Sequence, residues 1–107
     1  MNLEIKQIAE NFKQLLCNHY GERLQRLILF GSYARNDFHD ESDVDLMIVL
    51  NDIQVHHGLE IRALSKVVSD LSLKFGKSIS ILPVSKNRLE TSSLPFYTAV
   101  RREGIEL

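Results

Sequence analysis

Four residues near the middle of the chain could together bind a metal ion and phosphate. Gly31 and Ser32 follow one apolar run, and Asp43 and Asp45 precede another at a spacing of i and i+2. In a strand, side chains two residues apart point to the same face, so the two carboxylates would share one side. Paired carboxylates suit a hard divalent cation such as Mg²⁺, with phosphate oxygens completing its shell. These residue types therefore predict metal-assisted chemistry on a nucleotide.

The Gly-Ser turn can bind a phosphate group through its backbone. Gly31 permits close approach of the main chain, and the N–H groups of Gly31 and Ser32 can donate to phosphate oxygens. Arg35 lies one helical turn after Ser32 and could reach the same phosphates, although a surface arginine is the other interpretation. The predicted reaction moves a nucleoside monophosphate group from a nucleoside triphosphate (NTP) to a hydroxyl, with two divalent ions flanked by Asp43 and Asp45.

Apolar periodicity predicts the elements that would position these residues. The predicted helices span about residues 3–20, 55–75 and 96–103, with a short helix from 32, and the predicted strands span 23–30, 43–50, 78–84 and a final extended segment, 105–107. The expected fold class is α/β, a small mixed sheet with helices packed against it. The first two strands run parallel or antiparallel depending on the path of the spacer between them.

Composition narrows the functional classes. The chain has 107 residues, 44% of them hydrophobic and 25% charged, which predicts one globular domain. A net charge of −1 argues against sequence-independent binding of long nucleic acid, which needs clustered cations. The single cysteine, Cys17, excludes an internal disulfide and fits the reducing cytoplasm. No apolar run reaches membrane-spanning length, and the N-terminus lacks a signal-peptide core.

The segment GSYARN followed by SDVDLMIVL resembles the signature of the nucleotidyltransferase fold of the DNA polymerase beta superfamily. That signature is Gly-Ser, a ten-residue spacer and then Asp-x-Asp, as found here between Ser32 and Asp43. The small size and the ending LPFYTAVRREGIEL are similar to the minimal nucleotidyltransferases, or MNT proteins. These are commonly the antitoxin halves of HEPN/MNT toxin–antitoxin pairs. The resemblance implies a single minimal nucleotidyltransferase domain over residues 1–107.

The resemblance also implies a substrate and a partner. It suggests transfer of AMP from ATP, with two Mg²⁺ ions, to a tyrosine of a HEPN-domain ribonuclease toxin in a hetero-oligomer. Asp43 and Asp45 would be the catalytic and metal-binding residues, and Gly31, Ser32 and Arg35 would bind the nucleotide.

One position departs from the family pattern. In the family a later strand supplies a third carboxylate, which accepts the proton of the attacking hydroxyl, but here Ser80 stands at that place. A phenolic acceptor with a pKa of about 10 would need no such base. The protein could alternatively bind a nucleotide without efficient transfer. Another acid could also substitute, the candidates being Asp40, Glu41, Asp52 and Glu60.

Three functional hypotheses follow. The first is an antitoxin that adenylylates its toxin. The second is a catalytically weak or inactive antitoxin that neutralises the toxin by direct binding, and the third is an enzyme that modifies a small hydroxylated acceptor such as an aminoglycoside. Lys77 is a minor candidate for contacting the triphosphate. No nucleobase pocket is predicted, and Phe96 and Tyr97 are expected to anchor the last helix in the core.

Overall fold

A computed structural model of the chain describes residues 2–107. Helices and strands alternate along it, in the order α1 (Leu3–Tyr20), the 3₁₀-helix η1 (Gly21–Arg23), β1 (Leu24–Phe30), α2 (Ser32–Arg35), β2 (Val44–Leu50), α3 (His57–Phe75), β3 (Ile79–Ser85), α4 (Lys86–Thr91), α5 (Pro95–Glu103) and β4 (Ile105–Glu106). No helix within residues 2–107 is long and apolar enough to cross a membrane.

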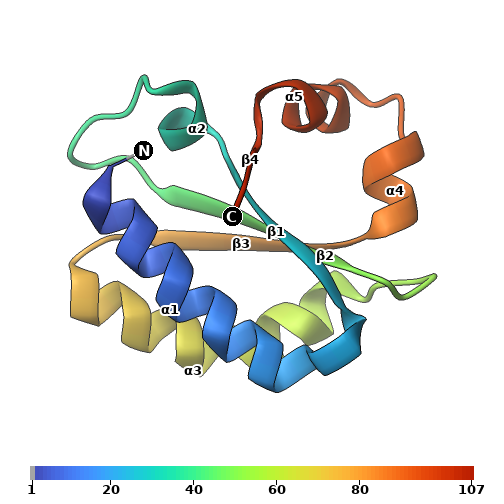
Figure 1. Cartoon of the computed structure of the whole chain (residues 1–107), viewed down its shortest axis with the longest axis horizontal. Coiled ribbons are helices and arrows are strands. Elements are labelled where there is room, and N and C mark those ends of the chain that lie inside the picture. Colours follow the sequence, from blue (N-terminus) through green and yellow to red (C-terminus); the bar gives the residue numbers. More distant parts are fainter. Residues whose placement is uncertain (1) are drawn as a thin grey trace.

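The strands form one mixed sheet in the order β3-β2-β1-β4 (Figure 1). β1 is antiparallel to both β2 and β4, whereas β2 and β3 are parallel and are joined by the long helix α3. The expected α/β class with a small mixed sheet is therefore confirmed. The orientation of the first two strands, open on sequence grounds, is antiparallel.

Helices cover both faces of the sheet (Figure 1). Alternate residues of β2 divide between the two cores, because successive side chains in a strand point to opposite faces. Leu46 and Ile48 pack with Phe12 of α1 and Leu64 of α3 on one face. Met47 packs on the other face, with residues of α4 and α5. Because both faces of the sheet are covered, nearly all residues of β2 are apolar.

The first helix follows from its sequence. The Asn2 side chain caps its start by accepting hydrogen bonds from the N–H groups of Glu4 at 2.7 Å and Ile5 at 3.2 Å. Apolar residues then recur at helical spacing and turn one face into the core. Gly21 ends the helix with a positive φ of 58°. The predicted range 3–20 matches α1.

The remaining boundaries agree to within two residues, but α4 is missing from the sequence prediction. The Ser85 hydroxyl caps this helix by accepting from the Arg88 N–H at 3.1 Å. Its six residues contribute one buried side chain, Leu89, so no apolar periodicity marks it. Such a short helix depends on its cap and on packing against β3 and α5 rather than on a repeating pattern.

Candidate active site

The antiparallel register of β1 and β2 brings the Gly-Ser turn against the acidic pair. Phe30, the last residue of β1, is the Cα partner of Asp45 in β2. Gly31 follows Phe30 directly and precedes the first residue of α2, Ser32. The two halves of the predicted motif, separated in the chain by the spacer, therefore meet at one end of the two central strands.

Gly31 is needed at this position for two reasons. Its φ is +74°, in the region that side chains of L-residues rarely adopt. A Cβ built on Gly31 would also overlap the Asp45 Oδ2 atom, so the carboxylate lies directly against the turn. The Gly31 carbonyl then accepts from the N–H groups of Ala34 and Arg35, both at 3.1 Å, which fixes the first turn of α2.

Asp45 is held in an environment that disfavours its charge. It is half-buried on the face of β2 opposite the α1 and α3 core, while Asp43 just before the strand is exposed. Burial raises the pKa of Asp45, and the nearby Asp43 carboxylate raises it further, whereas the Arg35 guanidinium lowers it. A divalent cation between the two carboxylates would relieve both of the unfavourable contributions.

Gly31, Ser32, Arg35 and Asp45 open into one hollow of about 360 Å³, whereas Asp43 is not among its lining residues. It is lined by Phe30, Gly31, Ser32, Arg35, Asp45, Phe96, Ala99, Val100 and Glu103. The four residues from α5 are spaced i, i+3, i+4 and i+7, so one face of that helix forms a wall of the hollow. The volume lies within the range of small-molecule sites, roughly 300–1,000 Å³.

Arg35 stands at the exposed rim of the hollow. Its Nε donates to Asp37 Oδ2 at 3.1 Å, and its Nη1 lies 4.0 Å from Glu103 Oε2. Both contacts are with solvent-accessible carboxylates and are therefore weak, so an incoming phosphate can replace them. Glu103 is a site residue that sequence reasoning missed. The sequence signal for Glu103 is its helical spacing from Phe96, which identifies it as a site residue only if this face of α5 is known to line the hollow.

Ser80 lies beside Asp45 on the neighbouring strand. The two residues are Cα partners in the parallel pair β2–β3, so their side chains project on the same face. Ser80 is exposed, and β3 is an edge strand. The geometry places a hydroxyl, and no acid, next to Asp45 on this side.

Two of the four substitute acids considered on sequence grounds, Glu60 and Asp52, are held away from Ser80's position. Glu60 is bound at the other end of β2 by the Arg23 guanidinium at 3.2 Å, and Asp52 by the same group at 2.9 Å. Asp40 and Glu41 are exposed in the spacer loop. Within residues 2–107, no group of three or more His, Cys, Asp or Glu side chains is arranged to hold a metal ion.

The donors present nevertheless fit a hard cation that is shared with a substrate. Asp45 offers carboxylate oxygens at the start of β2, and the charge of Asp43, just before the strand, is close enough to raise the pKa of Asp45. Mg²⁺ is usually bound by one or two carboxylates, with waters and substrate phosphates completing its octahedron. A binding mode of this kind needs no third protein ligand.

Lys77 is not among the described residues that line this hollow. Its ammonium group lies 3.5 Å from Glu4 Oε1 and 5.9 Å from the centre of the Tyr33 ring, on the α1 side of the sheet. The Tyr33 hydroxyl, by hydrogen bonding, raises the pKa of Lys77, and Glu4 raises it further. The suggested contact with a triphosphate stays a prediction, because in this structure the Lys77 side chain is engaged by Glu4 and Tyr33.

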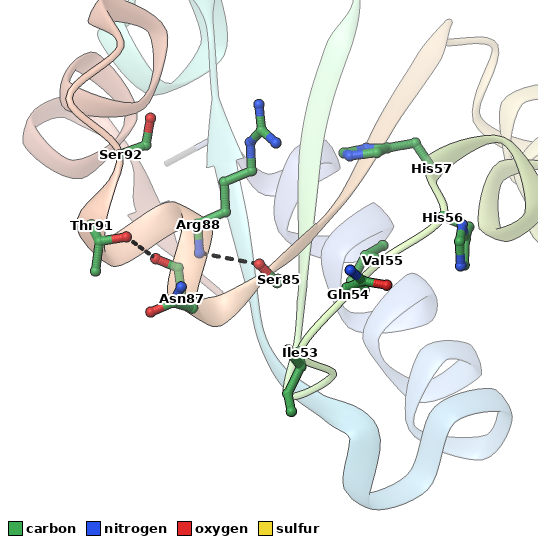
Figure 2. A pocket seen from close by; sticks show the side chains of 10 residues that line it. All are labelled: Ile53, Gln54, Val55, His56, His57, Ser85, Asn87, Arg88, Thr91 and Ser92. Atoms are coloured by element: carbon green, nitrogen blue, oxygen red, sulfur yellow. Dashed lines mark hydrogen bonds between the residues drawn. The ribbon is translucent and has the colours of Figure 1, made fainter.

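A larger hollow, of about 570 Å³, lies at the opposite end of the strands, where β2 and β3 finish (Figure 2). Figure 2 shows Arg88 and His57 pointing toward one another across it, with Asn87 and Ser92 on the α4 side. None of its described lining residues is acidic, and it contains no residue of the Gly-Ser or Asp-Val-Asp segments. Size alone therefore does not identify the site, and the chemistry favours the smaller hollow.

The family follows from comparison with known proteins. A profile of the nucleotidyltransferase domain matches residues 5–102. The chain belongs to this family. Among its relatives in Methanocaldococcus jannaschii, the candidate protein adenylyltransferase MJ0141 is 35% identical over 98% of this chain and 100% of its own length. A second, MJ0604, is 33% identical over 94% of each chain.

Solved structures agree on the nucleotidyltransferase fold. A candidate minimal nucleotidyltransferase superposes with a TM-score of 0.60 at 24% identity, over 100% of this chain and 97% of its own. A toxin–antitoxin complex crystallised with AMP-PNP gives a TM-score of 0.62 at 20% identity, over 91% of this chain and 69% of that chain. The expected minimal nucleotidyltransferase fold is thus confirmed.

Proposed function

We propose that this nucleotidyltransferase, acting as a single domain over residues 1–107 in the cytoplasm, transfers AMP from ATP to a hydroxyl of a partner protein. The partner would be a HEPN-domain ribonuclease toxin, and the modification would neutralise it within a hetero-oligomer. The observation that carries the proposal is the contact between the Gly31-Ser32 turn and the Asp45 carboxylate, which share one hollow with Arg35.

The relatives support the choice of reaction and partner. Those in Methanocaldococcus jannaschii are named as candidate protein adenylyltransferases. A solved complex of a tri-AMPylated HEPN toxin of Shewanella oneidensis with its MNT antitoxin matches with a TM-score of 0.52 at 17% identity, over 92% of this chain and 70% of that chain. The shared fold supports this use of the site, and the reaction itself is argued from the residues.

Four residues of the hollow, together with Asp43 beside it, would have separate roles. The N–H groups of Gly31 and Ser32 would hold the β- and γ-phosphates, and Arg35 would exchange its carboxylate partners for phosphate oxygens. Asp43 and Asp45 would hold two Mg²⁺ ions, which supply charge neutralisation at the attacking and leaving oxygens. The acceptor oxygen forms a bond to the α-phosphorus, the bond from that phosphorus to the bridging oxygen breaks, and pyrophosphate leaves.

Ser80 sets a condition on the acceptor. A serine hydroxyl is far too weak a base to take the acceptor's proton, and it is exposed beside Asp45. A phenol ionises at a pKa of about 10, well below an alcohol, so a tyrosine can release its proton to solvent with little help. The proposed tyrosine acceptor therefore agrees with a site in which a serine, Ser80, is the neighbour of Asp45.

The test is the intact mass of a HEPN toxin encoded in the same operon, after incubation with this protein, ATP and Mg²⁺. We expect the toxin to gain one or more AMP units, and Asp45→Asn to abolish the gain. Asp70→Asn is a matched control, because Asp70 is exposed on α3 and paired with Lys66 at 2.9 Å. Modification that persists with both Asp43→Asn and Asp45→Asn would contradict the assigned metal role.

The second candidate is an antitoxin that acts by binding alone, and Ser80 is the observation that favours it. It predicts a stable complex, no mass gain, and inhibition of the toxin that is indifferent to ATP and to the aspartate substitutions. Ser80→Asp separates the two functions further. It restores an acid as the neighbour of Asp45 and should accelerate transfer in an active enzyme, whereas a binding antitoxin would show no change in toxin inhibition.

A further inference from the structure

The wall that α5 contributes to the active-site hollow has two chemically different ends. Glu103 lies at one end, near Arg35, and Phe96 lies at the other. Seven residues of α-helix separate them, which is about 10 Å along the axis. Ala99 and Val100, small and apolar, fill the stretch between. The hollow therefore runs from a charged end to an aromatic end.

Phe96, unlike the neighbouring Tyr97, does not lie in the core. Tyr97 is 5% exposed and Val100 is 5% exposed, and together they attach α5 to the sheet. Phe96 is 42% exposed. The expectation that both aromatic residues anchor the core is thus wrong for Phe96, because the helix turns this residue toward the hollow rather than toward Met47.

The Phe96 ring is nevertheless held in a fixed orientation. It meets Phe30 edge to face, with centroids 5.6 Å apart and planes at 84°, and meets Tyr97 at 5.1 Å and 78°. Edge-to-face contacts of this kind are favourable in themselves and restrict ring rotation. Phe96 therefore presents an ordered aromatic surface to the hollow at little cost in side-chain entropy.

The order of the groups matches the order of parts in a nucleotide. Arg35 and Ser32 lie at the phosphate end, and Asp45, the proposed metal ligand, follows. Asp45 is the Cα partner of Phe30, whose ring contacts Phe96. A nucleotide whose γ-phosphate lies at the charged end of the hollow, with its α-phosphate near Asp45, would place its sugar and base at the aromatic end.

We infer that Phe96 is the platform on which the nucleobase of the bound nucleotide stacks. The inference rests on the proposed function and adds to it the residue that recognises the base. Stacking on an aromatic ring accepts any base, since every base has a π-face, and favours the larger purines. Phe96 thereby binds the base of any nucleotide, with a modest preference for the larger purines and no choice between adenine and guanine.

The experiment compares ligands with and without a base. Isothermal titration with Mg²⁺ measures the affinity of the full chain and of Phe96→Leu for ATP and for tripolyphosphate. Leucine keeps an apolar side chain and removes the ring, so we expect ATP to bind about tenfold more weakly. Tripolyphosphate should bind both proteins alike. Equal loss for both ligands, or no loss for ATP, would overturn the inference.

A fluorescent variant gives an independent readout. The chain contains no tryptophan, so Phe96→Trp introduces a single indole at the platform. We expect its emission to be quenched by ATP and unchanged by tripolyphosphate. Leu73→Trp is the matched control, because Leu73 is 81% exposed on α3, away from the hollow, and should respond to neither ligand.

The outcomes separate the two proposals. If ATP fails to bind the unaltered protein, the proposed nucleotide site fails and the inference falls with it. A second outcome is that ATP binds the unaltered protein, that Asp45→Asn weakens this binding, and that neither Phe96→Leu nor Phe96→Trp shows an effect that depends on the base. The proposed nucleotide site would then stand, but Phe96 would not be the platform for the base.

Discussion

We expect Asp45 to lower the stability of the folded protein at neutral pH, because its pKa is raised in the folded state. Burial and Asp43 raise the pKa of Asp45 above the 3.8 of an unperturbed aspartate. A carboxyl whose pKa is higher in the folded state contributes stability below its unfolded pKa, and loses it as the pH rises through the folded pKa. At pH 7 the ionised group therefore opposes folding, which is the expected condition of a side chain kept for binding rather than for stability.

We accordingly expect Asp45→Asn to raise the melting temperature at pH 7 while abolishing nucleotide transfer. The gain should shrink as the pH falls toward 4, where the native carboxyl becomes protonated. Thermal unfolding at the two pH values measures the difference, with Asp70→Asn as the exposed control. A melting temperature at pH 7 that is unchanged or lower in Asp45→Asn would show that the charge is not destabilising.

Gly31 should tolerate no side chain. Gly31→Ala places a methyl group against Asp45 Oδ2 at a φ of +74°, and such backbone strain costs roughly 1–3 kcal/mol. We expect a lower free energy of unfolding together with weaker binding of ATP, because the carboxylate must move.

Urea denaturation and calorimetric titration of Gly31→Ala test this expectation. Gly58→Ala is the control, since no atom lies within 4 Å of its added Cβ and the residue sits in the first turn of α3. Gly58→Ala should be neutral or slightly stabilising. Equal behaviour of the two variants would show that the close approach at Gly31 is unimportant.

Between elements, a polar cluster ties α1 to α3 at the end of the sheet away from the site. The Tyr20 hydroxyl donates to Glu60 Oε1 at 2.8 Å, and Arg23 bridges Glu60 and Asp52. Burial and the hydrogen bond to Glu60 raise the pKa of Tyr20, so the hydroxyl stays protonated and remains a donor.

Tyr20→Phe removes this donor and should lower the free energy of unfolding by about 1 kcal/mol. ATP affinity should not change, because the cluster and the hollow lie at opposite ends of β2. Chemical denaturation and calorimetric titration of the same preparation give both values. A change in ATP affinity without a change in stability would mean that the cluster serves the site rather than the fold.

The elements also show what the sequence alone could predict. α1 was predictable because its apolar residues follow a helical period, and β2 because its apolar run is nearly continuous. The Gly-Ser and Asp-x-Asp motif predicted that Gly31 and Asp45 serve one site, but the antiparallel register that brings them together stayed open on sequence grounds. The roles of Phe96 and Glu103 were not predictable, because they depend on how α5 packs across the sheet. The spacing of residues within a segment indicates the local structure of that segment. It does not indicate that α5, which is distant in the sequence, forms a wall of the hollow.

In the whole molecule, the sheet order places Asp45 one strand away from an edge of the sheet. α5 and α2 stand on the β1 side, whereas β3 on the other side is the sheet edge (Figure 1). The Val44 N–H donates to the Ser78 carbonyl at 2.8 Å, so in the parallel ladder the alternate residues Ile79 and Ile81 direct their N–H groups outward. An acceptor side chain would reach Asp45 over this edge, beside Ser80.

Hydrogen exchange with the proposed toxin can test this approach. We expect the outward amides of Ile79 and Ile81 to exchange rapidly in the free protein and to become protected in the complex. Half-exposed Ile61 and Val68 border the same edge and should be covered with it. Residues 53–57, at the opposite end of the molecule, should keep their exchange rates. Protection confined to residues 53–57 would place the partner at the wrong end for transfer.

The chain distance between the contacts of the site has a consequence for the order of folding. Gly31 and Asp45 are fourteen residues apart, whereas Asp45 and Ser80 are thirty-five apart. Closing the shorter loop costs less entropy, and the antiparallel pair β1–β2 does not have to wait for the α3 crossover. We therefore expect the contact between Gly31 and Asp45 to form before β3, the strand whose edge is proposed to face the partner, is added to the sheet.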